Sequence, residues 1–321
     1  SRGLGDVYKR QHYNDTTLKG FSHTHLSGTG CIDLGDILFR PTTLKPDLTT
    51  ESIYQPAAFS HKDEDASAGY YSVVLKEEGI KAELTVTAHA GMHRYTFSSG
   101  KEASIIIDLT HLLDNEYIYE AELEQTAANE ITGMRRTRGW TDNQYVYFVA
   151  QFSKPFQAID FIQNKKMVSA GVKLNGTDLQ ACLSFDNSNG EPVIAKVGLS
   201  IVSEKNAREN LETEVIGFDF DAVRSAARSA WEQALSAITV KGGNTDDLKN
   251  FYTAMYHSMV VPNVVSDVNG EYRRHNMEIG QLPKGKVQYS TFSLWDTFRA
   301  WNPLMTLIDT TSVSYTHLRA H

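Results

Sequence analysis

The sequence predicts an antiparallel all-β sandwich followed by linker helices and the start of an all-helical domain. From Cys31 to about Ser203, short segments alternate apolar and polar residues, the period of two that is typical of half-buried strands. After Ile216 the apolar residues recur at helical spacing. Gly242-Gly243 then divides the helical part into two segments.

The clearest strand pair is a hairpin. Gly69–Lys76 (GYYSVVLK) and Ile80–Ala88 (IKAELTVTA) are joined by a Glu-Glu-Gly turn, and each has one apolar side. Nine further segments continue the pattern: Met92–Phe97, Ala103–Leu109, Tyr117–Leu123, Glu130–Arg138, Tyr145–Phe152, Phe156–Ile162, Lys173–Leu174, Leu179–Phe185 and Val193–Val202. About ten short strands at this spacing indicate a large sandwich over residues 12–218.

Two helices follow the strands. In Asp219–Ile238 apolar residues recur every three or four positions, which predicts a linker helix within residues 219–243. Asn244 with Asp247 three residues later resembles a helix N-cap, so a second helix begins there. We expect residues 244–312 to form the beginning of a helical domain.

The two ends of the chain are related to each other as DNA. A DNA sequence that encodes residues 1–11 (SRGLGDVYKRQ) has a reverse complement that encodes residues 313–321 (VSYTHLRAH) in one frame. Such ends resemble a sequencing adapter translated together with a gene, so we exclude them from fold reasoning. We therefore expect His12–Ser312 to be an internal piece of a longer protein, with native termini and any signal peptide outside it.

The composition excludes two kinds of partner. The chain has 31 basic and 39 acidic residues; four and one of these lie in the two ends, which leaves a formal charge of −11 for the rest. This acidic balance argues against nucleic acid and against an anionic membrane surface. No stretch approaches the eighteen or so apolar residues of a membrane-spanning helix. Cys31 and Cys182 form neither a metal-binding spacing nor a disulfide framework.

The stretch Tyr289–Leu307 (YSTFSLWDTFRAWNPLMTL) gathers large aromatic side chains beside an acid and a base. Trp295, Asp296 and Arg299 are the combination expected of a sugar site, where rings cover the apolar side of a pyranose and charged groups bind its hydroxyls. The alternative is structural: Ser-Leu-Trp-Asp296 fits a capping box, in which case Trp295 and Phe298 are core and Arg299 is solvated. On that view Pro303 bends or restarts the helix.

A second candidate is the loop Gly20–Gly30 (GFSHTHLSGTG). Its glycines allow close backbone approach to a ligand, and its hydroxyls and imidazoles offer directional hydrogen bonds. The alternative is an ordinary polar surface loop before the first strand. His23 and His25 could contribute to a zinc site, but no third ligand is recognisable.

Three weaker patterns have simpler interpretations. Met134–Arg138 (MRRTR) is interpreted as a solvated face, with an anion site as the alternative. Asp267–Gly270 begins like a calcium loop but lacks the later acid, which favours a tight turn. His89 and His93 flank Gly91 at a strand break and are interpreted as structural.

Three motifs together resemble glycoside hydrolase family 92, the calcium-dependent exo-acting α-mannosidases. They are GFSHTHLSGTG with GDILFRP at Gly35–Pro41, YHSMVVPNVVSDVNGEY at Tyr256–Tyr272, and YSTFSLWDTFRAWNPLMTLI at Tyr289–Ile308. They occur in the family's order, with the predicted sandwich between the first and the second. Asn269 and Arg274-His275 depart from the family's pattern.

The resemblance implies an N-terminal sandwich, connecting helices and the truncated start of an (α/α)6 barrel that carries catalysis. Family members hydrolyse α-linked mannose with inversion, using a general acid, a general base and bound calcium; an inverting pair holds its carboxyls about 6.5–9.5 Å apart. The catalytic groups and calcium ligands match nothing before Ile308, so the expected catalytic and metal residues within this chain are none. The substrate is expected to be a mannose-containing glycan, met in the periplasm, outside the cell or at its surface.

Carried over residue by residue, Asp296 would bind hydroxyls of the terminal mannose and Trp295 would shape its pocket. His25, Ser27, Gly28 and Thr29 would border it from the sandwich, and Arg299 would lie beside it. The chain by itself is expected to bind sugar poorly and to hydrolyse nothing. Two alternatives remain open: a non-catalytic carbohydrate-binding sandwich, and an inverting sugar phosphorylase of similar architecture. Linkage preference and oligomeric state do not follow from the sequence.

Overall fold

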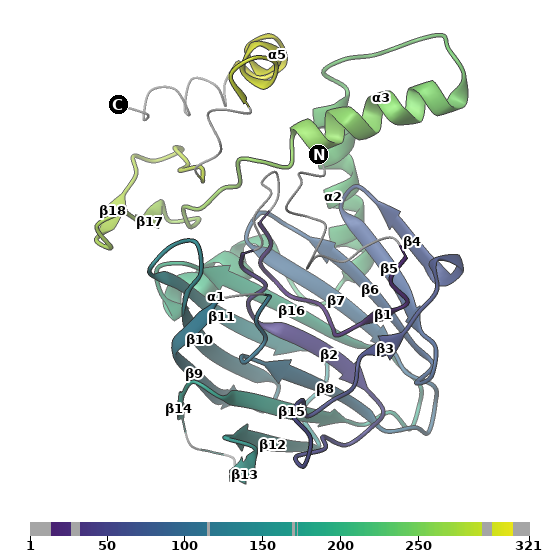
Figure 1. Cartoon of the computed structure of the whole chain (residues 1–321), viewed down its shortest axis with the longest axis vertical. Helices are drawn as coiled ribbons and strands as arrows, with labels where there is room; N and C mark the ends of the chain where they lie inside the picture. The colour runs from purple at the N-terminus through teal and green to yellow at the C-terminus, as the bar shows by residue number, and fades with distance from the viewer. Residues whose placement is uncertain are drawn as a thin grey trace.

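The computed structural model describes residues 14–26, 33–113, 116–168, 171, 173–290 and 297–310. Two antiparallel sheets of nine and five strands stack face to face, and helices α3 and α5 lie beyond the top of this sandwich (Figure 1). The predicted sandwich followed by helices is therefore confirmed. No helix within these ranges is both long and apolar enough to cross a membrane.

The larger sheet has the spatial order β14-β9-β10-β11-β16-β7-β6-β5-β4. In chain order its strands are β4 (Glu64–Ser67), β5 (Tyr70–Leu75), β6 (Ile80–Val86), β7 (Ala90–Thr96), β9 (Tyr117–Ala127), β10 (Glu130–Arg138), β11 (Gln144–Phe152), β14 (Leu174–Gly176) and β16 (Val193–Ser200). The smaller sheet has the order β13-β12-β15-β8-β2. Its strands are β2 (Leu38–Thr42), β8 (Ala103–Asp108), β12 (Ala158–Gln163), β13 (Lys166–Val168) and β15 (Leu179–Phe185).

Two short strand pairs, the 3-10 helix η2 (His61–Asp63) and four α-helices complete the regular structure in the described ranges. The pairs are β1 (Thr17–Leu18) with β3 (Ala57–Ala58), and β17 (Glu271–Arg273) with β18 (Ile279–Gln281). The helices are α1 (Glu204–Glu214), α2 (Phe220–Leu235), α3 (Thr245–Ser258) and α5 (Trp301–Ile308).

The main core lies between the two sheets. Strand β11 shows how the sequence builds it, because its buried side chains Val146, Phe148 and Phe152 alternate with residues that face outward. Phe152 stacks on Phe39 of the smaller sheet with 6.3 Å between ring centroids and 9° between planes. Aromatic contacts of this kind join the two sheets into one core.

Helix α1 covers the outer face of the larger sheet and was missed by the sequence analysis. Its buried residues are Asn206, Ala207, Asn210 and Leu211, half of them polar, so no apolar repeat at helical spacing marks it. Gly198 on β16 lets the helix approach closely, since a Cβ there would lie 2.4 Å from the Ala207 carbonyl oxygen. The sandwich thus has a helical layer that periodicity alone does not reveal.

The predicted cap of α3 is confirmed. The Asn244 side chain accepts a hydrogen bond from the Asp247 N–H at 2.8 Å, which satisfies one of the free donors at the helix start. Helix α5 begins at Trp301 and carries Pro303 in its first turn, where the missing N–H costs nothing. The structure therefore favours a restarted helix at Pro303.

Candidate functional site

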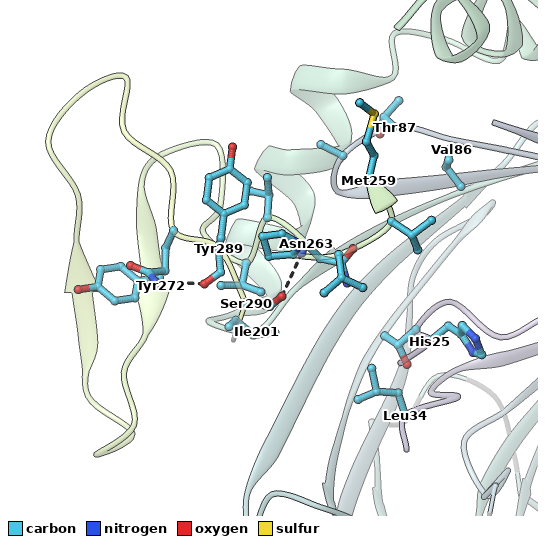
Figure 2. Close-up of a pocket in the computed structure, with 18 of the residues that line it drawn as sticks. His25, Leu34, Val86, Thr87, Ile201, Met259, Asn263, Tyr272, Tyr289 and Ser290 are labelled. Atoms are coloured by element: carbon cyan, nitrogen blue, oxygen red, sulfur yellow. Dashed lines mark hydrogen bonds between the residues drawn. The ribbon is translucent and has the colours of Figure 1, made fainter. Parts of the chain in front are cut away.

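A wide cleft of about 2230 Å³ separates one end of the sandwich from the C-terminal segments (Figure 2). The sandwich contributes residues 23–25 of the Gly20–Gly30 loop, the turn between β6 and β7, and the turn between β10 and β11. The opposite wall comes from α2, α3, residues 259–265, the β17–β18 hairpin, residues 288–290 and α5. Six aromatic residues are distributed around it: Tyr145, Trp231, Tyr256, Tyr272, Tyr289 and Trp301.

Only some of the site residues expected from sequence can be placed. His25 lines the cleft, as do Tyr289 and Trp301 from the aromatic stretch. Arg299 is exposed and is not among the lining residues. The other expected binding residues lie outside the described ranges: Ser27, Gly28, Thr29, Trp295 and Asp296. The capping alternative placed Phe298 in the core, but this side chain is 67% exposed.

Two of the six aromatic lining residues, Tyr145 and Trp231, lie outside the motifs that mark the site in the sequence. Tyr145 sits on β11 and Tyr272 on β17, 127 positions apart in the chain, while Trp231 and Tyr256 belong to two different helices. The Trp231 and Tyr256 rings contact each other with centroids 4.6 Å apart. No short motif contains these residues together, so only their convergence in space identifies them as one lining.

The Gly20–Gly30 loop is fastened to the chain that follows it. The Thr24 hydroxyl accepts hydrogen bonds from the N–H groups of Gly35 (3.1 Å) and Asp36 (2.8 Å), and donates to the Asp36 carboxylate (2.7 Å). Leu34 and Ile37, which flank Gly35 and Asp36, have φ angles of +74° and +58°. Such angles are costly for a β-branched residue and concentrate at functional sites, which favours the ligand-loop interpretation over a plain surface loop.

A chain of hydrogen bonds through two histidines holds the base of this loop. His23 Nδ1 lies 2.6 Å from the Ile37 carbonyl oxygen, so this nitrogen carries the proton. His23 Nε2 must then accept, and His93 Nε2 donates to it across 2.9 Å. The remaining His93 nitrogen accepts from the Tyr95 hydroxyl at 2.7 Å. Both nitrogens of His23 are therefore engaged, which removes it as a zinc ligand, and His93 is structural as expected.

These two histidines make stability depend on pH. Burial lowers the pKa of His23 from 6.5 to about 4. Burial, helped by the neighbouring His23, also lowers the pKa of His93 well below its usual value. The two histidines therefore bind protons more weakly in the folded state than in the unfolded state. Stability is fully present above about pH 6.5 and is lost as pH falls toward the folded values.

We therefore expect His23 and His93 to lower the free energy of unfolding between pH 7 and pH 5, by at most about 1.4 kcal/mol per pH unit for each histidine. Glu116 and His89, whose pKa values are raised, contribute to the slope with the opposite sign. Urea denaturation at several pH values measures this slope above the range where most carboxylates titrate. His23→Gln and His93→Gln should each flatten it, whereas His257→Gln, exposed on α3, should not. A slope that neither substitution changes would contradict the assignment.

Arg135 overturns the solvated-face interpretation of Met134–Arg138. Its side chain is 1% exposed, and its Nε lies 3.0 Å from the Asp36 carboxylate. It also donates to the carbonyl oxygens of Leu109 and His111. The error has a physical cause, since β10 points every second residue inward and Arg135 finds there an acid from a distant segment.

Glu116 lies beside the same guanidinium, at 3.8 Å. Burial, helped by Asp36 and Asp33, raises the pKa of Glu116 to about 7 against the opposing effects of the Leu113 N–H and Arg135. Asp36 is thus the nearer of the two acids to the Arg135 guanidinium. The Arg135–Asp36 pair holds the backbone directly after the Gly20–Gly30 loop in place.

Asp267 joins the sandwich layer to the cleft's far wall. Its carboxylate is 5% exposed and accepts from Ser200 Oγ (2.7 Å), Asn206 Nδ2 (2.8 Å) and Asn210 Nδ2 (2.7 Å). The Gly270 N–H donates to the Asp267 carbonyl at 2.8 Å. The tight-turn interpretation of Asp267–Gly270 is confirmed. The Asp267 side chain binds the turn to α1 through Asn206 and Asn210.

A second contact ties the same segment down. His89 bridges the Glu214 carboxylate at 2.5 Å and the Ser266 carbonyl at 2.7 Å. Burial lowers the pKa of His89, but Glu214 more than offsets this and leaves it raised. The structural interpretation of His89 is confirmed. Further hydrogen bonds also hold residues 263–290, among them Arg273 Nε to the Ile201 carbonyl oxygen (2.8 Å) and the Val268 N–H to Asn210 Oδ1 (2.9 Å).

The described carboxylates of the cleft are Asp142, Glu214 and Asp309. Glu214 is committed to His89 and Thr87, and these hydrogen bonds outweigh its burial and keep its pKa low, so it stays ionised. Within the ranges that the structure covers, no group of three His, Cys, Asp or Glu residues is placed to hold a metal ion. This part of the cleft is therefore suited to binding and positioning a polar ligand.

Comparison with known proteins agrees with this geometry. Residues 5–200 match the model of the glycosyl hydrolase family 92 N-terminal domain, and residues 206–317 match that of the family 92 catalytic domain. These matches run a few residues into both terminal segments, whose adapter origin stays a prediction. A secreted glycosidase of Arthroderma benhamiae, described as uncharacterized, is 29% identical over 343 residues, covering 94% of this chain and 42% of that protein.

Solved structures show the same architecture. A family GH92 alpha-mannosidase from Bacteroides thetaiotaomicron superposes with a TM-score of 0.87 and 36% identity, covering 95% of this chain and 42% of that one. Another gh92 family glycosyl hydrolase gives 0.83 and 25%, with 94% and 42% covered. The chain thus spans about two fifths of the length of these relatives. With two consecutive domain models matched over most of its length, it belongs to glycosyl hydrolase family 92.

Proposed function

We propose that this chain is part of an exo-acting α-mannosidase that hydrolyses terminal α-mannosyl residues of N-glycans or mannans with inversion. The observation that carries the proposal is the match to both family 92 domains in a chain 36% identical to an alpha-mannosidase. The same mannosidase has been solved with mannoimidazole bound. A free-standing sugar-binding module is disfavoured, since it has no need of a catalytic-domain segment.

In this proposal the described residues form part of the wall of the sugar site. The ligand loop is set by Thr24, His23 and the strained backbone at Ile37. Tyr272 and Tyr289 lie on the opposite side of the cleft (Figure 2). Aromatic faces pack on the apolar side of a pyranose, while the peptide groups and hydroxyls of the loop can bind its hydroxyl groups.

Calcium is not accounted for by the described residues, which offer no suitable ligand group. That the longer protein binds calcium, through residues after Ile308, stays a prediction. We also propose that the enzyme acts in the periplasm or outside the cell. The description of the fungal relative as secreted supports this location.

The test is mannose release by the protein extended to the length of its relatives. Yeast mannan and a high-mannose N-glycan are the substrates, with and without a chelator. We expect mannose of inverted anomeric configuration, by NMR of the fresh product, and loss of activity on chelation. Indifference to the chelator, with mannose 1-phosphate formed when phosphate is supplied, would establish the phosphorylase alternative instead.

Asp296→Ala separates sugar binding from helix capping. If Asp296 binds mannose hydroxyls, we expect kcat/KM to fall about 10- to 100-fold with little change in melting temperature, as for the loss of a charged hydrogen bond. Ser293→Ala is the matched control, because it removes the other half of the capping box. If the acid only caps a helix, both variants should lose about 1 kcal/mol of stability and keep their activity.

A further inference from the structure

Three of the four exposed aromatic side chains among the described residues lie on one part of the larger sheet. Tyr117 and Tyr119 on β9 are 59% and 39% exposed, and Trp140 in the β10–β11 turn is 65% exposed; the fourth is Phe298. Exposing a single ring is ordinary, but grouping three in one place is not needed for folding. Together with Tyr145 on β11 they are called the aromatic patch below.

The patch is rigid. The Arg136 guanidinium lies between two of its rings, 5.0 Å from the centroid of Tyr119 and 5.3 Å from that of Tyr145. Asn143 Oδ1 accepts from Arg136 Nε and Nη2 at 3.0 and 2.5 Å, which fixes the guanidinium in this position. Tyr117 packs edge-on against Tyr119 with centroids 5.3 Å apart. A ligand that stacks here meets rings that lose little freedom on binding.

The patch is continuous with the cleft. Tyr145 belongs to both, and the residues directly after Trp140, beginning with Thr141, line the cleft. On the far side Arg273 of β17 lies over the Tyr145 ring at 4.3 Å. The turn itself is held close to the ligand loop's exit, because the Trp140 N–H donates to the Asp33 carboxylate at 3.3 Å. A ligand leaving the cleft along this side would pass over the patch.

The charged groups on either side of Trp140 suit a neutral, hydroxyl-rich ligand. Arg138 and Asp142 flank Trp140, lie 3.4 Å apart and are 60% and 85% exposed. Because their charges are paired, they offer hydrogen bonds without attracting an anion or a cation strongly. Nucleic acid, or a strongly charged protein partner, would require an excess of one sign.

We propose that the aromatic patch is an outer subsite for the glycan chain, which binds sugar units beyond the terminal residue held in the cleft. The inference rests on the proposed mannosidase function, because it assumes that the terminal sugar lies in the cleft and that the rest of the glycan extends outward from it. It assigns to Trp140, Tyr119 and Tyr117 a role in recognising the length of the substrate. It leaves recognition of the terminal sugar to the cleft.

The test compares two substrates in the protein extended to the length of its relatives. For an aryl α-mannoside, which has no second sugar, Trp140→Ala and Tyr119→Ala should leave KM unchanged. For a linear α-mannotetraose each should raise KM about tenfold, equivalent to the stacking of one ring. Met167→Ala, 53% exposed on β13, is the control for loss of an exposed apolar side chain and should change neither.

Equal effects on both substrates, or no effect on either, would overturn the subsite. Failure of the unsubstituted protein to release mannose from both substrates would contradict the proposed function instead. In that case calorimetric binding of mannotetraose decides the subsite: Trp140→Ala should weaken it about tenfold, and unchanged affinity or absent binding overturns the proposal.

Discussion

Replacing Arg135 by methionine is expected to lower the free energy of unfolding by about 3–5 kcal/mol. The substitution keeps an unbranched side chain, though a shorter one, and leaves the fully buried Asp36 carboxylate, 3.0 Å from Arg135 Nε in the native chain, without its basic partner. The carbonyl oxygens of Leu109 and His111 lose a donor as well. Thermal and urea denaturation of the chain measure the loss.

Arg138→Met is the matched control on the same strand. Arg138 is 60% exposed and pairs only with an exposed acid, so its removal should change stability by less than about 0.5 kcal/mol. Asp36→Asn combined with Arg135→Met should recover part of the loss, because no unpaired buried charge then remains. A loss below about 1 kcal/mol for Arg135→Met alone would show that the buried pair contributes little.

Replacing Asp267 by alanine is the second change with a large expected effect. The Ser200 hydroxyl and one N–H each of Asn206 and Asn210 would lose their acceptor, at a cost of about 3 kcal/mol. The second N–H of Asn206 keeps Glu271, and that of Asn210 keeps the Leu199 carbonyl oxygen. Because the acid links α1 to residues 263–290, we expect this segment to loosen first. Hydrogen exchange should rise in residues 263–290 and stay low in the inner strands.

Asp246→Ala provides the comparison for Asp267→Ala. Asp246 is 87% exposed in the first turn of α3, and its carboxylate lies 3.9 Å from Lys249 Nζ. Its removal should cost a few tenths of a kcal/mol and leave the exchange of residues 263–290 unchanged. Equal protection of that segment in Asp267→Ala and the unsubstituted chain would mean that its other contacts, including His89 with Ser266 and Arg273 with Ile201, are enough to hold it.

Local sequence patterns predict the elements whose cause is local. Alternation along β10 and β11 follows directly from side chains that point to opposite faces, so these strands match their predicted ranges to within a residue. The cap at Asn244 depends on a donor three residues away, and it forms as predicted. The aromatic stretch Tyr289–Leu307 and the Gly20–Gly30 loop are also predicted by the sequence, because composition is a local property of a segment.

Contacts between distant segments were decided by the tertiary structure. Helix α1 escapes detection because its polar buried side is satisfied by Asp267, 57 and 61 positions further along. His23 meets His93 across 70 positions.

The sequence by itself thus determined the sandwich, the change to helices and the two stretches that lead toward the cleft. The fold alone decided that Arg135 is a buried partner of Asp36 and that Trp140, Tyr119 and Tyr117 gather beside the cleft. The physical reason is the same in both cases: the periodicity of a segment reflects neighbours along the chain, whereas the burial of a charge or the grouping of rings depends on partners that only folding brings together.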